Sequence, residues 1–285
     1  MFPRLFTYES FALPTYGVLV ALGFVAALAV IVKLAGREGL NQDQMFNFGV
    51  YLALTGMIGA KIFLVEQDWD YYSANPRQIF SFSVLQSGGI FFGGFLVAFA
   101  FGAFYVRRMK LPFLKVADSF APGIAVGHAF GRLGCFAAGC CWGEPSGLPW
   151  AVAFTDPYAH EVVGVPLGVD LHPTQLYESA ALFLTFAFLY RMHARKRFDG
   201  QLLGWYLVLY PGARFIVEFV RYHSSNAWIW RDRLSDAQGI ALALVATGAW
   251  LLWLSAYRKL PVGAALATEG HRGPAPQRAA KLSRQ

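Results

Sequence analysis

The sequence predicts an all-α polytopic membrane protein with about seven transmembrane helices. Of its 285 residues, 56% are hydrophobic and 14% are charged, whereas soluble domains carry about 25% charged residues. Apolar stretches of about 18 to 22 residues, each long enough to cross a bilayer as a helix, recur along the chain. Disorder is excluded by the hydrophobic composition, and collagen-like repeats are excluded because Gly and Pro show no period. A small disulfide scaffold is excluded because three Cys form too few disulfides to stabilise a chain of this length.

The first three spans are expected near residues 14–35, 46–65 and 89–106. The first dozen residues lack a basic region, a following apolar run and a cleavage site, so the first span is expected to be retained. The second span carries Lys61 near its outer end. The outer start of the third span contains GGIFFGGF at 88–95, with paired glycines that include Gly93 and Gly94, a pattern typical of a loop or the start of a helix.

The other four spans are expected near residues 116–141, 173–190, 201–219 and 236–257. The fourth is rich in Gly, which lets a neighbouring helix or a lipid chain approach its backbone closely. Pro173 suits the first turn of the fifth span, where its missing N–H costs no hydrogen bond. We therefore predict one integral-membrane domain, residues 1–260, followed by a disordered basic cytoplasmic tail, residues 261–285.

The distribution of Lys and Arg predicts the orientation of the chain. Of the 24 such residues, sixteen follow the first, third and fifth spans or lie in the tail, and five lie on the opposite side. Cytoplasmic loops carry an excess of these residues, so the N-terminus is expected outside and the C-terminus in the cytoplasm. The net charge of +7 therefore indicates an orientation in the membrane and no nucleic-acid partner.

The most informative ionisable residues inside the predicted spans are Lys61, Arg132, Arg214 and Glu218. A charge in the hydrocarbon core costs at least about 2.5 to 3.5 kcal/mol, so such residues are functional candidates by default. At about 1.5 Å per residue, Arg132 and Arg214 both fall in the outer half of the membrane. Lys61 and Tyr16, at the outer ends of their own spans, fall at the same level.

Two interpretations of this layer of charges are open. In the structural one, Arg214 pairs with Glu218 one turn away, Lys61 extends to the interface and Arg132 bonds a carbonyl oxygen. In the functional one, the layer is an anion site in the outer leaflet. Two guanidiniums suit a lipid phosphate, because the planar fork holds two of its oxygens together and stays charged when buried.

Further polar residues are candidates for the same site. His128 lies four residues before Arg132, on the same helix face, so it is either a structural residue or a base beside a phosphate. Gln175 and Glu178 belong to the segment HPTQLYE at 172–178, which forms either an interfacial cap or a polar wall of the site.

Cys135, Cys140 and Cys141 are expected at the outer end of the fourth span. Their C-x4-C-C spacing gives poor tetrahedral reach for zinc and no second His lies nearby in sequence, so no metal is indicated. We interpret them first as small packing residues. An oxidised pair between Cys135 and either of the other two, if the outside is oxidising, is the alternative. No organic cofactor is indicated.

Taken in order, six segments resemble those of the prolipoprotein diacylglyceryl transferases of the bacterial inner membrane. They are TYG at 15–17, GGF at 93–95, ADSFAPG at 117–123, GRLGCFAAGCCWG at 131–143, HPTQLYE at 172–178 and YPGARFIVEFVR at 210–221. The resemblance implies a multi-pass protein of the bacterial cell inner (cytoplasmic) membrane, with its active site towards the periplasmic leaflet. It also implies transfer of the diacylglyceryl group of phosphatidylglycerol to the lipobox cysteine of a preprolipoprotein, with release of glycerol phosphate.

The resemblance assigns roles to several residues. Arg132 and Arg214 match the family's essential arginines and would bind the phosphate, while Tyr16 and Tyr210 match its site tyrosines. The expected catalytic residues, with the base proposed above, are Arg132, Arg214, His128 and Tyr210. The expected substrate-binding residues are Tyr16, Lys61, Gly93, Gly94, Gly143, Gln175, Glu178, Glu218 and Arg221.

This chain departs from the family pattern at two places. Phe92 stands where a His usually precedes the paired glycines, and Cys135 and Cys140 stand where Asn and Glu are usual. A carbon ring cannot accept a proton, so either His128 takes over the basic role or the acceptor differs. Two other functions stay open: a paralogous phospholipid-dependent transferase with a different acceptor, and a non-catalytic lipid-binding or transport membrane protein. The apolar inner halves of the spans disfavour a transport path.

Overall fold

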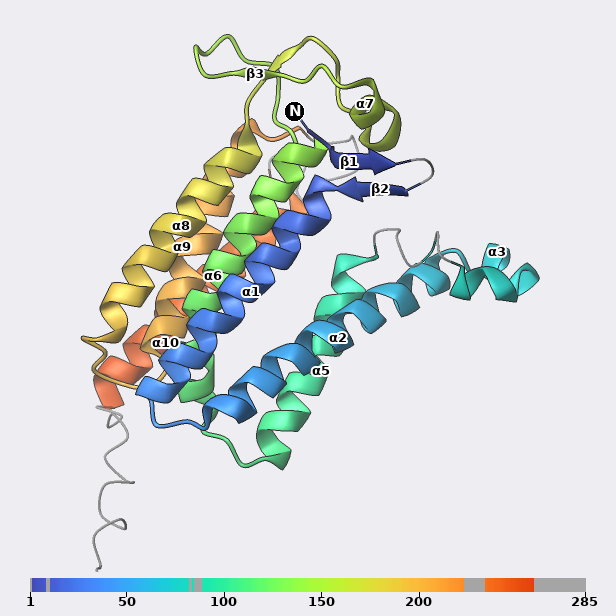
Figure 1. Ribbon diagram of the computed structural model, residues 1–285. Coiled ribbons are helices and arrows are strands. Elements are labelled where there is room, and N and C mark those ends of the chain that lie inside the picture. Colours follow the sequence, from blue (N-terminus) through green and yellow to red (C-terminus); the bar gives the residue numbers. More distant parts are fainter. Residues whose placement is uncertain (1, 9–10, 82–83, 85–88, 223–233, 259–285) are drawn as a thin grey trace, which may run out of the picture.

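The computed structural model of the protein describes residues 2–8, 11–81, 84, 89–222 and 234–258. The tail predicted for residues 261–285 lies outside the described residues. Long helices dominate the described chain, and each overlaps one of the predicted spans (Figure 1). They are α1 (Thr15–Arg37), α2 (Gln42–Gln67), α5 (Phe91–Arg108), α6 (Phe113–Ala138), α8 (Thr174–His193), α9 (Gln201–Val217) and α10 (Asp236–Arg258).

Five of these helices are long and apolar enough to cross a membrane. They are α1, α2, α5, the N-terminal part of α10 (Asp236–Leu254), and α9 together with its 3-10 extension η2, Glu218–Val220. The helices α6 and α8 reach a similar length but carry polar residues such as Asp118, Arg132 and Glu178. The all-α membrane architecture is therefore supported by five apolar helices, and the full number of seven crossings remains a prediction.

Short elements complete the fold. The strands β1 (Arg4–Tyr8) and β2 (Phe11–Pro14) form an antiparallel hairpin before α1, and β3 (Val152–Ala153) pairs antiparallel with β4 (Asp170–Leu171). The short helices are α3 (Trp69–Ala74), η1 (Pro76–Phe80) and α7 (Pro157–Val163). These small strands are the local exception to the all-α prediction.

The helix α6 is central, because it packs against α1, α8 and α9. Small residues allow its close approach to α1. A Cβ atom added at Gly23 would lie only 2.8 Å from the carbonyl oxygen of Gly127, and one added at Gly123 would lie 2.5 Å from the side chain of Ile31. The Gly-rich pattern of the fourth predicted span thus serves helix packing in the membrane.

The helices α2 and α5 form a hairpin that diverges from the rest of the bundle towards α3 (Figure 1). At its other end the hairpin is fixed to α1 and α6 by a buried apolar core. This core consists of Ile31, Ala35, Met45, Phe48, Val106, Val116 and Phe120. Phe48 also stacks on Tyr105, with ring centroids 4.6 Å apart. This core anchors the hairpin to the bundle.

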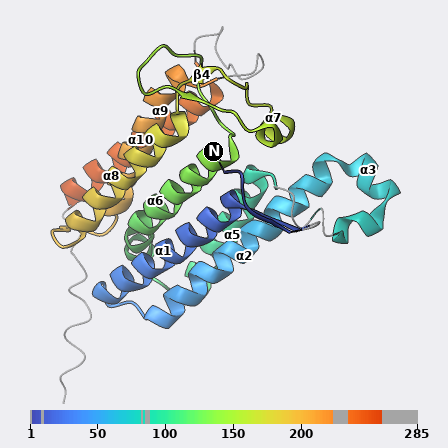
Figure 2. The same ribbon diagram turned by 45° about the horizontal axis from the view of Figure 1, so that its top comes forward.

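Residues 139–173 form a cap segment at the end of the bundle (Figure 2, in which this end comes forward). A small apolar core of Phe154, Ala159, Val165 and Leu171 holds it together, and Phe136 from α6 packs against this core. The cap segment is joined to η2 by a bridge between Gly143 and Arg221. It thereby closes the end of α6, α8 and α9 where the candidate site lies.

The opposite end of the bundle is held by a buried polar clamp of Glu38, Asp118, His193, Lys196 and Asp199. The Asp118 carboxylate accepts hydrogen bonds from the backbone N–H groups of Gly200, Leu202 and Leu203, at 2.8 to 3.0 Å, and so caps the start of α9. Lys196 pairs with Asp118, Asp199 and Glu38. This clamp ties α1, α6, α8 and α9 together at a distance from the cap segment.

Candidate functional site

Three arginines from different parts of the chain converge on one glutamate beside the cap segment. The Nε atom of Arg132 on α6 lies 2.9 Å from a carboxylate oxygen of Glu178 on α8. Arg214 on α9 and Arg221 after η2 approach the other oxygen of the same carboxylate, at 3.5 and 3.6 Å. Glu178 is 2% exposed, so the carboxylate is surrounded by protein. The sequence predicted each residue but not their convergence on Glu178.

A second carboxylate, Glu218, completes this arginine cluster of Arg132, Arg214, Arg221, Glu178 and Glu218. Glu218 pairs with Arg214 one helical turn away, as the i, i+4 spacing predicted. Three guanidiniums face two carboxylates, so the cluster carries an excess positive charge. Buried charge of this kind is retained where it can meet an opposite charge, and planar guanidiniums match phosphate oxygens.

Glu218 is held by the start of α10, a connection that was not predicted. The Ser235 hydroxyl donates a hydrogen bond to Glu218 at 2.8 Å. Ser235 and Gln238 also cap α10 reciprocally, because each side chain accepts a hydrogen bond from the backbone N–H of the other. The sequence SDAQ at 235–238 is a capping-box signal that could have marked this helix start, although not its contact with Glu218.

The first turn of α8 attaches the site to the end of α6. The Gln175 amide donates to the carbonyl oxygen of Cys140 at 2.7 Å, and the Thr174 hydroxyl donates to that of Cys141 at 2.8 Å. One turn along, the Ser179 hydroxyl donates to the carbonyl oxygen of Ala129 at 3.0 Å. Gln175 is fully buried, and its hydrogen bond fixes the backbone at the edge of the arginine cluster.

Gly143 allows the cap segment to pass closely over this end of the bundle. A Cβ atom there would lie 2.5 Å from the carbonyl oxygen of Val220 and 2.6 Å from the Cβ of His172. The Gly143 N–H donates to the carbonyl oxygen of His172 at 3.0 Å. Gly143 thus permits the bridge that positions Arg221.

His128 and Tyr210 lie next to each other beside the arginine cluster. Their ring centroids are 4.8 Å apart, and the rings meet edge to face. Arg132 acts electrostatically on both groups, and Tyr206 stacks on Tyr210, with centroids 6.0 Å apart. The structure therefore brings together the predicted base, a predicted site tyrosine and a predicted phosphate-binding arginine.

Tyr16 lies at the start of α1, where its ring contacts α6. A Cβ atom added at Gly134 would lie 3.0 Å from this ring, and 44% of the tyrosine surface is exposed. Arg132 also acts electrostatically on Tyr16. Tyr16 is thus on the α1 side of the arginine cluster, near Arg132.

Comparison with known sequences decides the family. The prolipoprotein diacylglyceryl transferase family matches residues 3–254. This chain belongs to that family. A phosphatidylglycerol–prolipoprotein diacylglyceryl transferase of Finegoldia magna is 34% identical over 82% of this chain and 87% of its own length. One of Clostridium tetani is 31% identical over 91% of this chain and all of its own length, and one of Nitratidesulfovibrio vulgaris is 34% identical over 83% and 88%. The resemblance drawn from the sequence motifs is confirmed.

In this member of the diacylglyceryl transferase family, Lys61, Gly93 and Gly94 lie on the α2–α5 hairpin, which diverges from the other long helices (Figure 1). A Cβ atom added at Gly94 would lie 2.7 Å from the carbonyl oxygen of Gly56, so this glycine serves the close contact of α2 and α5. Lys61 donates a hydrogen bond to the carbonyl oxygen of Val84. A role of these three residues in substrate binding remains a prediction.

Phe92, where the family resemblance leads us to expect a histidine, also lies on this hairpin. Its side chain is 67% exposed, and its ring contacts that of Phe91, with centroids 5.9 Å apart. Exposure of an apolar ring on a helix long enough to span the membrane is typical of a lipid-facing position.

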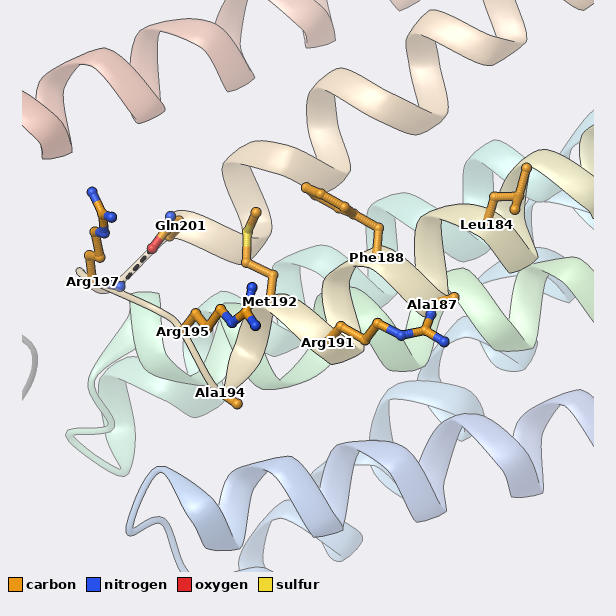
Figure 3. A pocket seen from close by; sticks show the side chains of 9 residues that line it. All are labelled: Leu184, Ala187, Phe188, Arg191, Met192, Ala194, Arg195, Arg197 and Gln201. Carbon is orange, nitrogen blue, oxygen red and sulfur yellow. Dashed lines mark hydrogen bonds between the residues drawn. The ribbon is translucent and has the colours of Figure 1, made fainter.

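A cavity of about 810 Å³ lies at the C-terminal end of α8 (Figure 3). Arg191, Arg195 and Arg197 line it together with Phe188 and Met192. None of the predicted site residues lines this cavity. We therefore define the site by its converging charges.

Proposed function

We propose that this protein transfers the diacylglyceryl group of phosphatidylglycerol to the lipobox cysteine thiol of a preprolipoprotein and releases glycerol phosphate. The observation that carries the proposal is the convergence of Arg132, Arg214 and Arg221 on the buried carboxylate of Glu178. The relatives named phosphatidylglycerol–prolipoprotein diacylglyceryl transferase support the same reaction.

In the proposed reaction, a thiolate attacks the glyceryl carbon that bears the phosphate. A carbon–sulfur bond forms, the carbon–oxygen bond to phosphate breaks, and the glycerol phosphate leaves with the bonding electrons. Arg132 and Arg214 stabilise the charge that the departing phosphate gains. Fixed donors in a site with little water are worth more than the same donors in solution. Glu178 holds the guanidiniums in place before the substrate arrives.

The acceptor thiol must lose its proton, because only the thiolate is a good nucleophile. We propose that His128 accepts this proton. His128 lies beside Tyr210, and Arg132 acts on it electrostatically. Phe92 cannot perform this task. The assignment of His128 as general base follows from its position and from the chemistry of imidazole.

We further propose that the chain crosses the bacterial inner membrane seven times, with the arginine cluster towards the periplasmic leaflet. Support comes from the Lys and Arg residues at the opposite helix ends, such as Arg37 of α1, Arg108 of α5 and Arg191 of α8. Cytoplasmic ends of membrane helices carry this excess of positive charge. A lipid headgroup in the outer leaflet then lies at the level of the cluster.

The proposal is tested with purified protein in detergent, phosphatidylglycerol and a peptide that carries a lipobox cysteine. Mass spectrometry should detect a diacylglyceryl adduct on the cysteine, and Arg132→Ala combined with Arg214→Ala should abolish it. Arg191→Ala, at the far end of α8, is the matched control and should retain the product. Equal product from the double variant and the control would contradict the phosphate-binding role, and no adduct with any form would contradict the proposed reaction.

A further inference from the structure

The three cysteines of the chain are clustered at one point of the structure. The Sγ atoms of Cys135, Cys140 and Cys141 all lie within 4.8 Å of one another. All three are free thiols, and each side chain is partly exposed. The sequence spacing was expected to give poor reach for a tetrahedral zinc site, but it does bring three sulfur atoms to a common centre.

The end of α6 explains how the cluster forms. Gly139 adopts a left-handed conformation, with φ of 80°, and its N–H bonds to the carbonyl oxygen of Phe136. The N–H of Cys140 bonds back to the carbonyl oxygen of Cys135 at 3.1 Å. This pair of hydrogen bonds is a Schellman motif, which turns the chain so that Cys140 returns beside Cys135.

The third thiol is held in place at a conformational cost. Cys141 has a φ of 63°, which is uncommon for a residue with a Cβ atom. The hydrogen bond from Thr174 to the Cys141 carbonyl oxygen and that from Gln175 to the Cys140 carbonyl oxygen maintain this turn. Strained residues of this kind persist only where neighbours fix them, and they concentrate at functional sites.

Positive charge lies near the cluster. Arg221 and Arg132 act electrostatically on Cys141, and the thiolate is the form of cysteine that binds metals. Gln175 adds a buried acceptor: its Oε1 atom has no hydrogen-bond partner among the described residues, although its Nε2 atom donates to Cys140. Such an acceptor can bond a water molecule that a metal ion holds.

We propose that Cys135, Cys140 and Cys141 form a three-thiolate binding site for a thiophilic metal ion of the Zn²⁺ and Cu⁺ class. With metal–sulfur bonds of about 2.3 Å, three sulfurs around one ion lie about 4 Å apart, close to the spacing found here. Soft thiolate ligands select this class of ion. Each coordinating thiol releases its proton to solvent, and no electron is transferred. For Zn²⁺, a water molecule would take the fourth position.

Cd²⁺ is a suitable probe, because thiolate coordination gives it a charge-transfer absorption in the ultraviolet. The full-length protein is reduced, freed of reductant under anaerobic conditions and titrated in detergent. We expect one Cd²⁺ per chain, retained through gel filtration. Cys141→Ser should weaken binding at least tenfold. Cys141→Ser combined with Ala194→Cys keeps three thiols in the chain but only two in the cluster, since Ala194 lies exposed beyond α8, and it should bind as weakly.

A second measurement needs no variant. Alkylation of the native protein, read for each cysteine by mass spectrometry, should be slowed at all three cysteines by one equivalent of Cd²⁺. Binding by the relocated-thiol variant that equals the wild type, or protection of fewer than three cysteines, would overturn the proposal. Because neither readout requires turnover, failure of the metal site leaves the proposed transferase reaction untouched.

Discussion

At the scale of single residues, Glu178 has the most informative position. The sequence suggested a polar wall or an interfacial cap, because HPTQLYE begins a predicted span with several polar side chains. In the structure three arginines lie close to the carboxylate of Glu178, and the Glu178 side chain is almost fully buried. Sequence spacing relates residues on one helix, as it did for Arg214 and Glu218, but it does not relate α6, α8 and α9 to one another.

Replacement of Glu178 by glutamine should destabilise the fold. The amide keeps the size of the side chain but removes the negative charge that offsets Arg132, Arg214 and Arg221. Breaking a buried pair by removing one partner costs about 3 to 5 kcal/mol. Thermal unfolding in detergent should therefore show a clearly lower midpoint for Glu178→Gln. Glu161→Gln, at an exposed position of α7, is the control, and equal midpoints for the two variants would refute the central role of Glu178.

The proposed base gives a prediction about pH. If His128 takes the thiol proton, His128→Asn should lower turnover and remove the fall of the rate on the acid side of the pH profile. His160→Asn changes a histidine of the cap segment, whose ring bonds the carbonyl oxygen of Val165, and should keep the wild-type profile. Full activity of His128→Asn with an unchanged profile would assign the proton to another group.

At the scale of elements, the helices were predictable and the connections were not. Long apolar runs located every long helix to within a few residues, because a span requires about 20 apolar residues and tolerates few alternatives. The sixth predicted span, 201–219, corresponds to α9 and η2. The two-residue strands of the cap segment carry almost no signal of their own, since they depend on contacts such as Val152 with Leu171.

The contact between α2 and α5 yields a matched pair of substitutions. A Cβ atom at Gly59 would lie 2.6 Å from Val97 and 2.7 Å from the carbonyl oxygen of Gly93. At Gly56, one turn earlier, the nearest atom would be 3.7 Å away, an ordinary contact. Alanine favours a helix by up to about 1 kcal/mol over glycine. Gly56→Ala should therefore leave the thermal midpoint equal or higher, whereas Gly59→Ala should lower it. The reverse order would show that the hairpin packs differently.

The polar clamp predicts how stability depends on pH. Burial raises the pKa of Glu38, but the close ion-pair contacts of His193 and Lys196 outweigh it, so the pKa lies below its ordinary value of 4.5. Folding therefore favours the carboxylate. This stabilisation is fully present above pH 4.5 and is lost as the pH falls through the lower pKa of the folded state.

Glu38→Gln is the variant that tests this dependence. Wild-type protein should unfold at a higher temperature than the variant at pH 7, and the difference should shrink as the pH falls below about 4.5. Glu66→Gln, at an exposed position of α2, is the control, and its unfolding temperature should match that of the wild type at each pH. A difference between wild type and Glu38→Gln that stays constant between pH 7 and pH 3 would contradict the ionic role of Glu38.

At the scale of the whole molecule, the charges are divided between the two ends of the bundle. The arginine cluster lies beside the cap segment, and the polar clamp lies at the other end with Arg191, Arg195 and Arg197 nearby. Sequence reasoning predicted that the charges inside the spans form one layer, because helix rise fixes depth, and the structure brings Arg132, Arg214 and Glu218 together at one end of the bundle. It could not foresee that Lys61 belongs to a hairpin that diverges from α6, since depth alone does not fix the lateral position of a helix.

This division of charge makes the orientation testable in a living bacterium. Green fluorescent protein fluoresces in the cytoplasm, and alkaline phosphatase is active only outside it. A fusion after Arg258, at the end of α10, should be fluorescent with the first reporter and inactive with the second. A fusion after Asn75, beyond α2, should give the opposite result, because the second span leads outwards. Reversal of both results would put the arginine cluster at the cytoplasmic face. The headgroup of a phospholipid in the outer leaflet could then no longer reach Arg132 and Arg214, so the proposed site for phosphatidylglycerol depends on this outcome.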